Sequence, residues 1–226
     1  MSYMILDRRA DGKIFENAGK LGFTVIPADY IKGIDETVAW HPDMQLVKIG
    51  SAVVVNPASL EYYRKAMKGI NLISGKSAVQ GKYPEYVAYN IALAGKTAIH
   101  NFKYTDETVK KLLKGYELIN VNQGYTKCSV CTLPDGIITS DRGVAESCEG
   151  KIDVLKIRQG EISLYGKDYG FIGGASGYFG GKLYFAGNVK LHSDYDKIKK
   201  FCEKKCIEIV CLSNDKLADI GSIIII

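Results

Sequence analysis

The spacing of turn-forming residues is the feature of this sequence that most constrains its fold. Short β-prone runs are joined by tight turns at Gly50-Ser51, Gly95-Lys96, Asp135-Gly136 and Gly180-Gly181. Glycine tolerates the positive φ that hairpin turns require, and Asp-Gly between apolar runs is a strong hairpin signal. Successive turns lie 45, 40 and 45 residues apart. A period of this size indicates a propeller or a solenoid built from one repeated unit.

The segments between these turns repeat one order of elements: strand, strand, helix, strand. Apolar residues at helical spacing, with capping residues at their ends, predict the helices. These helices are expected at 11–22, 56–68, 105–114, 142–148 and 194–204. The closing strands are expected at 23–27, 70–73, 116–121, 152–157 and 207–212. In the second unit, the first strand of the hairpin is expected at 86–93.

The two ends of the chain are expected to supply a fifth unit. Dividing 226 residues by five gives about 45 residues per unit, so a fifth turn would fall near residue 225, where the chain ends. We therefore expect the segment 217–226 to pair with the first strand, at 3–7. Such closure removes the free sheet edges that invite aggregation. The sequence thus predicts an α/β fold in a single domain, residues 1–226.

Composition limits the class of protein. Hydrophobic residues make up 46% of the chain and charged residues 24%, as in soluble globular proteins. The net charge of +5 is mild, and the lysines of 199–205 alternate with apolar residues like the solvated face of a helix, so no nucleic-acid partner is expected. The apolar run 223–226 is too short to span a membrane. We expect a cytoplasmic protein, and cysteines in that compartment are normally reduced. No membrane contact and no cofactor are expected. The oligomeric state stays open.

Several motifs together resemble the pentein superfamily. They are His41-Pro42-Asp43 before the first hairpin, the asparagines 56, 101 and 188 after second strands, Cys128-Ser129-Val130-Cys131, and Asp219-Ile220-Gly221-Ser222 near the C-terminus. The resemblance covers nearly the whole chain. It implies a five-bladed α/β propeller of ββαβ pseudo-repeats, closed by the N- and C-terminal strands. Members of this superfamily include guanidino-modifying enzymes and a non-enzymatic branch, the ribosome anti-association factor.

The resemblance also implies where a site would lie. In the enzymes of this superfamily, residues just before each hairpin face a central channel that binds substrate. If this arrangement also holds for the present chain, the resemblance implies Cys128 as the candidate nucleophile and His41 as the candidate base. The acidic residue that grips a guanidinium corresponds to Asp43, and a carboxylate suits a planar bidentate cation. The candidate substrate-binding residues are Asp43, Glu85, Tyr86, Ser176, Asp219 and Ser222.

The sequence departs from the enzymes at two places. Their catalytic histidine lies in the fourth unit, where this chain reads 173–177, Gly-Gly-Ala-Ser-Gly. Their nucleophilic cysteine lies in the last unit, where this chain has Asp219-Ile220-Gly221-Ser222. The usual mechanism therefore cannot be written. One hypothesis is a channel site for a small polar ligand, guanidino- or amine-bearing, in a divergent amidine hydrolase or amidinotransferase. The alternative is a non-catalytic binding or scaffold module like the ribosome anti-association factor.

Cys128 and Cys131 have a Cys-x-x-Cys spacing. If the segment is an extended strand, residues three apart point to opposite faces, so the pair is not expected to bind one metal ion or to form a redox disulfide. Structural thiols and one channel-facing cysteine both remain open, and no metal site is predicted. The glycines of 170–181 precede a hairpin instead of a helix, so they are not a dinucleotide fingerprint. They are expected to let backbones approach closely around the channel.

Overall fold

The computed structural model describes residues 2–226 as a mixed α/β protein with five three-stranded sheets. The strands are β1 (Tyr3–Leu6), β2 (Thr24–Pro27), β3 (Leu46–Ile49), β4 (Ala52–Val55), β5 (Asn71–Ser74), β6 (Ala92–Ala94), β7 (Thr97–His100), β8 (Glu117–Asn120), β9 (Val130–Leu133), β10 (Gly136–Thr139), β11 (Asp153–Lys156), β12 (Ser176–Phe179), β13 (Lys182–Phe185), β14 (Glu208–Cys211) and β15 (Ile224–Ile225). The helices are α1 (Gly12–Lys20), α2 (Leu60–Ala66), α3 (Glu107–Leu112), α4 (Thr126–Ser129), α5 (Arg142–Cys148) and α6 (Tyr195–Lys204), with 3-10 turns η1 (Pro42–Met44), η2 (Pro57–Ser59) and η3 (Val189–Leu191).

The four predicted hairpin turns are confirmed. Strands β3–β4, β6–β7, β9–β10 and β12–β13 pair antiparallel across them. Gly50, Gly95 and Gly180 have φ values of 59°, 57° and 59°. Residues with a Cβ adopt this left-handed conformation only at a cost, so glycine at these positions fixes where each hairpin turns.

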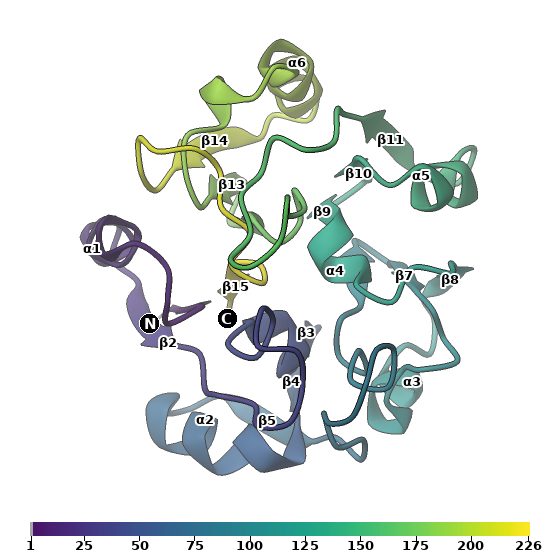
Figure 1. The fold of residues 1–226 in the computed structure, drawn as a ribbon. Helices are drawn as coiled ribbons and strands as arrows, with labels where there is room; N and C mark the ends of the chain where they lie inside the picture. Colours follow the sequence, from purple (N-terminus) through teal and green to yellow (C-terminus); the bar gives the residue numbers. More distant parts are fainter. Residues whose placement is uncertain (1) are drawn as a thin grey trace.

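The third strand of each sheet pairs parallel with the middle strand, and a helix lies between the two in sequence. In the sheet β3-β4-β5, for example, α2 connects β4 to β5. A tight turn joins antiparallel strands, whereas two parallel neighbours need a longer connection that returns the chain to the same end of the sheet. Figure 1 shows these helices on the outside of the molecule and the sheets inside. The predicted helices are confirmed, and α5 has the predicted bounds because the Asp141 side chain caps it by accepting from Val144 N at 2.9 Å.

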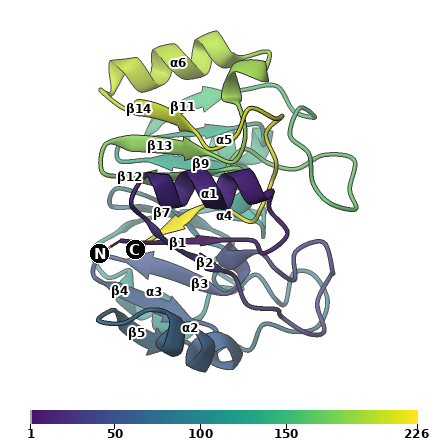
Figure 2. The ribbon, with the colours of Figure 1, turned by 90° about the vertical axis from the view of Figure 1, so that its left-hand side faces the viewer.

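The predicted pairing of the chain ends is confirmed. Strand β15 pairs antiparallel with β1, with Met4 opposite Ile225 and Ile5 opposite Ile224. The two ends of the chain lie close together in Figures 1 and 2. Strand β15 is much shorter than the expected 217–226, because Gly221 and Ser222 have φ values of 66° and 71° and take the chain out of extended conformation.

The five segments that lead into the sheets meet near the centre of the molecule. Two residues before the first strand of each hairpin, or before β15, lie Met44, Asn90, Cys128, Gly174 and Ser222. Gly174 N donates to Cys128 O at 2.7 Å, and Ser222 N donates to Gly174 O at 2.8 Å. Lys127 N donates to Asn90 O at 3.2 Å, and Asp43 N donates to Gly221 O at 3.2 Å. These bonds hold side chains from distant parts of the sequence at one place.

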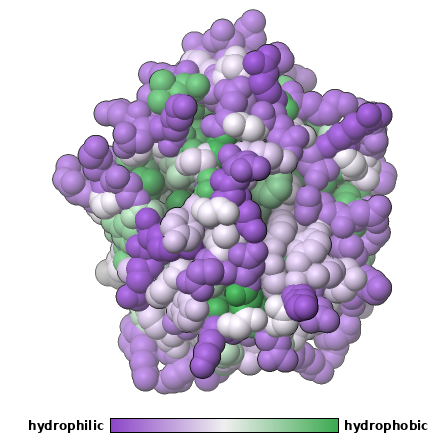
Figure 3. Space-filling model, viewed as in Figure 1, coloured by the Kyte–Doolittle hydropathy of each residue, from purple (hydrophilic) through white to green (hydrophobic). Residues whose placement is uncertain are grey.

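Buried side chains fill the spaces between neighbouring sheets instead of forming one central core. Tyr63, Tyr89 and Phe185 are among the largest fully buried side chains, and they belong to three different clusters. Figure 3 shows a largely hydrophilic face with small, separate hydrophobic patches. Among the helices of residues 2–226, none has the length and apolar character that crossing a bilayer requires.

The N-cap of α3 is Asp106, so this helix begins at Glu107 and not at residue 105, where the sequence analysis expected its start. The Asp106 carboxylate accepts from two amides of the first turn of α3, at 2.7 and 3.2 Å. Its other oxygen accepts from Lys76 N and Ser77 N, at 2.7 and 2.6 Å, in the preceding loop.

We expect Asp106→Ala to lower the free energy of unfolding by about 2 kcal/mol, the upper end for an N-cap. In urea unfolding, Asp11→Ala, which removes a cap with a single amide bond, should cost less.

His100 and Thr105 instead form a buried pair, with His100 Nδ1 and Thr105 Oγ1 2.6 Å apart. Burial lowers the pKa of His100 from its ordinary 6.5 to about 4. Below pH 6.5 the unfolded chain binds a proton at this residue that the native protein does not, until the pH approaches 4. Stability should therefore fall as the pH drops through this window. His100→Gln should flatten this part of the stability–pH curve measured by urea unfolding, and an unchanged slope would contradict the assignment.

Candidate functional site

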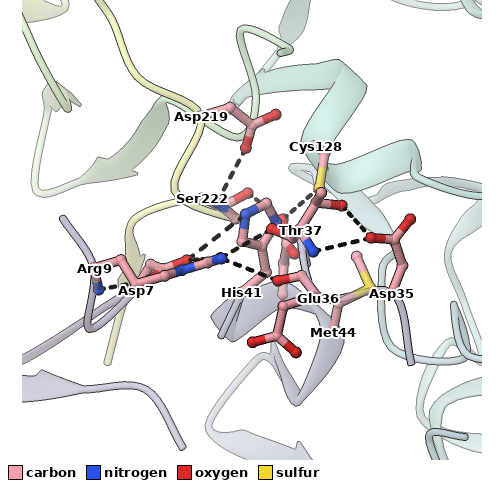
Figure 4. Close-up of polar contacts among 12 residues, drawn as sticks. Asp7, Arg9, Asp35, Glu36, Thr37, His41, Met44, Cys128, Asp219 and Ser222 are labelled. Atoms are coloured by element: carbon pink, nitrogen blue, oxygen red, sulfur yellow. Dashed lines mark hydrogen bonds and ion pairs between the residues drawn. The ribbon is translucent and has the colours of Figure 1, made fainter. Parts of the chain in front are cut away.

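A cavity of about 430 Å³ lies beside the meeting point of the five segments. Its buried lining includes His41, Cys128 and Asp219, and its exposed lining includes Asp35 and Asp168. Figure 4 shows His41, Cys128, Asp219 and Ser222 converging from different segments of the chain. The structure thus brings both predicted catalytic residues to one cavity.

Cys128 lies in a helical turn, α4, and not in the extended strand that the sequence predicted. Its Sγ donates to Asp43 Oδ2 at 3.1 Å and accepts from Asn90 Nδ2 at 3.4 Å. Burial, followed by the carboxylates of Asp43 and Asp219, raises the pKa of the Cys128 thiol well above its ordinary value. The thiol is therefore protonated at neutral pH, and it donates its hydrogen bond to Asp43, whereas no hydrogen bond joins it to His41, the predicted base.

The carboxylate of Asp43 links two other segments of the site. Its Oδ2 accepts from Ser222 Oγ at 2.6 Å as well as from Cys128, and Ser222 Oγ in turn accepts from Lys127 Nζ at 3.2 Å. Asp43 Oδ1 is buried and has no hydrogen-bond partner. One oxygen is thus held by two donors, whereas the other is available to a ligand.

His41 is fully enclosed, with 1% of its surface exposed, and neither ring nitrogen makes a hydrogen bond. The carboxylate of Asp7 lies close to the ring, with Oδ2 3.7 Å from His41 Nε2. Asp7 itself is paired with Arg9, at 2.7 Å. Sequence reasoning missed Asp7. It directly follows the middle strand β1, as Asn56 follows β4, and this equivalence is the signal that could have identified it.

Asp219 is buried in the cavity wall and held by two backbone amides. Its Oδ2 accepts from Phe171 N at 2.9 Å, and its Oδ1 accepts from Gly221 N at 3.0 Å. Burial raises the pKa of the Asp219 carboxyl, and the Asp43 charge acts in the same direction, while His41 lowers it. A positively charged group in the cavity would favour the ionised carboxylate, and it would thereby oppose the effects of burial and of the Asp43 charge on this pKa.

Three of the predicted binding residues lie outside this cluster. Glu85 is exposed, and its carboxylate accepts from Lys82 N at 3.3 Å. Tyr86 is buried, and its hydroxyl is hydrogen-bonded to the hydroxyl of Tyr125, which does line the cavity. Ser176 donates to Gly173 O at 3.4 Å, at the start of β12. Asn90 and Gly174 occupy the central places that the sequence assigned to Tyr86 and Ser176.

The Cys-x-x-Cys residues do not act as a pair. Cys128 packs in one buried cluster and Cys131, on β9, in another. Both are free thiols, and burial raises the pKa of Cys131 to about 11. The two cysteine side chains therefore lie on opposite sides, as the sequence analysis expected. A helical turn before the strand causes this arrangement, and not one continuous extended strand.

Aromatic rings and charged groups complete the wall of the cavity. The rings of Tyr83 and Tyr125 have centroids 4.8 Å apart, and Phe171 lies on the same lining. At the exposed part of the lining, Lys167 Nζ pairs with Asp35 Oδ2 at 3.2 Å. The arrangement can therefore bind a small molecule by stacking and by carboxylate contacts.

Solved structures with the same arrangement of elements define the class of fold. The chain has the fold of the pentein superfamily. It is similar to DDAH from Pseudomonas aeruginosa, which was solved as a mutant complexed with citrulline. The TM-score is 0.55, the identity is 9%, and the match covers 94% of this chain and 91% of that one. It is also similar to C. jejuni agmatine deiminase, with a TM-score of 0.56, 10% identity and coverage of 93% and 87%. Identities this low establish the fold alone.

A family profile makes the assignment more specific. The profile described as "Family of unknown function (DUF6873)" matches residues 5–224, so the chain belongs to this family. No curated protein sequence is significantly similar to it.

Proposed function

We propose that the cavity binds a small organic cation that carries a guanidino or amino group. The observation that carries this proposal is a buried carboxylate, Asp219, in a cavity wall that also holds the aromatic rings of Tyr83, Tyr125 and Phe171. Carboxylates pair with guanidinium groups through two parallel hydrogen bonds. Aromatic faces attract cations, and this attraction is stronger where water is excluded.

The charge balance of the buried residues supports a cationic ligand. Asp7, Asp43 and Asp219 are all buried near His41, and of these Asp7 forms a salt bridge with Arg9. Burying a carboxylate without a charged partner is costly, and like charges raise that cost. A cation that enters the cavity would offset the negative charge of Asp219 and of Asp43 behind it.

Two of the similar solved structures support this class of ligand. They are a dimethylarginine dimethylaminohydrolase and an agmatine deiminase, and both names refer to guanidino compounds. We infer further that the five sheets are the blades of an α/β propeller, which the hydrogen bonds between the central segments would close around the site. Cleavage of a C–N bond by Cys128 stays a prediction, because a thiol beside two carboxylates needs a positive group to become a thiolate.

Binding of matched ligands to the metal-free protein would test the proposal. Agmatine, arginine and methylarginine are expected to raise the melting temperature and to give saturable heats in calorimetry. Citrulline has nearly the shape of arginine but no guanidinium charge, so it should bind at least about tenfold more weakly, a difference of about 1.4 kcal/mol. Equal responses to arginine and citrulline, or no response to any of the cations, would refute a cation site.

A further inference from the structure

A second kind of ligand is indicated by the side chains beneath the cavity. His41, Asp43 and Cys128 each offer a potential metal-ligand atom, and these three atoms lie within 4.8 Å of one another. All three residues are buried, with exposures of 1%, 1% and 2%. They combine a nitrogen, an oxygen and a sulfur donor, which distinguishes them from a surface cluster of acidic residues.

The same residues hold an unusual share of unsatisfied polar atoms. Within residues 2–226, seven buried side-chain nitrogen or oxygen atoms lack a hydrogen-bond partner, and three of them are His41 Nδ1, His41 Nε2 and Asp43 Oδ1. Buried polar atoms are nearly always paired, because leaving them unpaired is costly. Three such atoms beside one thiol indicate that an additional ligand completes this cluster.

We propose that His41, Asp43 and Cys128 bind one zinc ion. A thiolate, an imidazole and a carboxylate are the side chains that bind Zn²⁺, whereas Mg²⁺ and Ca²⁺ prefer oxygen ligands throughout. On binding, the Cys128 thiol releases its proton to solvent and the resulting thiolate bonds to the ion, with no change in oxidation state. The thiolate and the carboxylate together balance the charge of Zn²⁺.

The surroundings of the three residues resemble the outer sphere of a metal site. Asn90 Nδ2 donates to Cys128 Sγ, and Ser222 Oγ donates to Asp43 Oδ2. Asp7 lies 3.7 Å from His41 Nε2, so one ring nitrogen can face this carboxylate while the other binds the ion. Partners of this kind orient ligands and increase metal affinity.

Three protein ligands leave the fourth position of a tetrahedral ion for water or another small ligand. His41 and Cys128 line the cavity, whereas Asp43 does not, so the open position would face the cavity. Asp219 is not among the proposed ligands. The zinc site therefore does not depend on the organic cation, and either ligand can bind if the other does not.

The test is titration of the full-length, EDTA-treated protein with Zn²⁺ and with Co²⁺. We expect one equivalent of either ion to bind, and the Co²⁺ protein to show a thiolate-to-cobalt charge-transfer band. Cys128→Ala should abolish the band, whereas Cys131→Ala should retain it. His41→Gln should weaken Zn²⁺ binding by more than about 100-fold, because loss of an outer partner alone costs about 10- to 100-fold. No band in the parent protein, or a band that survives in Cys128→Ala, would overturn the proposal.

Alkylation of the unmodified protein gives a result that does not depend on the folding of any variant. Zn²⁺ at ten or more times its Kd should slow alkylation of Cys128 by at least about tenfold, measured by mass spectrometry, because the ion then occupies the sulfur in about nine-tenths or more of the molecules. The exposed Cys206 serves as the internal control and should react at the same rate with and without zinc. Equal protection of both cysteines, or of neither, would count against the site. Agmatine binding by the metal-free protein is measured separately, so failure of one proposal leaves the other standing.

Discussion

Asp219→Asn is expected to weaken agmatine binding by roughly 10- to 100-fold, equivalent to about 1.5–3 kcal/mol for hydrogen bonds to a charged group. The substitution keeps the shape of the side chain and removes its charge. Because Asp219 is buried in the cavity wall, solvent does little to screen its attraction for a cation. Calorimetric titration of agmatine into the parent and variant proteins measures this difference directly.

The control for this prediction is Asp168→Asn. Asp168 also lines the cavity but is exposed, so its charge is screened and its loss should change the affinity less than about threefold, within the range of a surface ion pair. Asp219→Asn should also lower stability, because an amide offers one acceptor oxygen where the carboxylate accepts from both Phe171 N and Gly221 N. Binding must therefore be compared below the melting temperature of the variant. Equal losses in the two variants would show that the cavity responds to net charge and has no specific carboxylate.

The periodic turns could be predicted because their signal is local. A glycine at a position of positive φ, such as Gly50 or Gly180, identifies a hairpin turn without knowledge of the rest of the fold. The regular spacing of such turns then implied that the two ends of the chain share a sheet, which the pairing of β1 with β15 confirms. The architecture thus followed from local turn chemistry and counting.

The site residues were harder to predict because a small error in a strand boundary changes which residue faces the centre. The apolar run 86–93 was expected to be one strand, but β6 covers only Ala92–Ala94. Residues such as Val87 and Tyr89 are apolar because they pack in a buried cluster outside any strand. The sequence therefore points to Tyr86, whereas the structure places Asn90 at the centre.

Contacts between distant segments are not encoded in any short spacing. Asp43 is 85 residues from Cys128 and 179 residues from Ser222, yet its Oδ2 accepts from both. The pattern indicated that residues before the hairpins gather at the centre, but it could not specify which of them touch. It also gave no reason to expect His41, Asp43 and Cys128 to form a ligand set, because metal motifs are recognised in sequence by ligands close together along the chain.

Gly173→Ala is expected to destabilise the protein by about 3 kcal/mol or to prevent folding, since overpacking a rigid site costs about 1–3 kcal/mol or more. A Cβ at Gly173 would lie 2.2 Å from Lys127 O and 2.4 Å from Val130 O. Both atoms are backbone, and the segment they belong to positions Cys128, so they cannot move aside as a flexible side chain would. This close approach is the role that the sequence predicted for glycines of 170–181.

Urea unfolding of Gly173→Ala beside Gly19→Ala separates this close contact from the general effect of replacing glycine. Gly19 lies in α1, where a Cβ would meet nothing within 4 Å, so alanine there should raise stability by about 0.5–1 kcal/mol. Opposite signs for the two variants are expected, because the same methyl group meets backbone in one place and solvent in the other. If Gly173→Ala instead unfolds like the parent protein, the segments around Cys128 are not packed as closely as described, and the geometry of the site must differ as well.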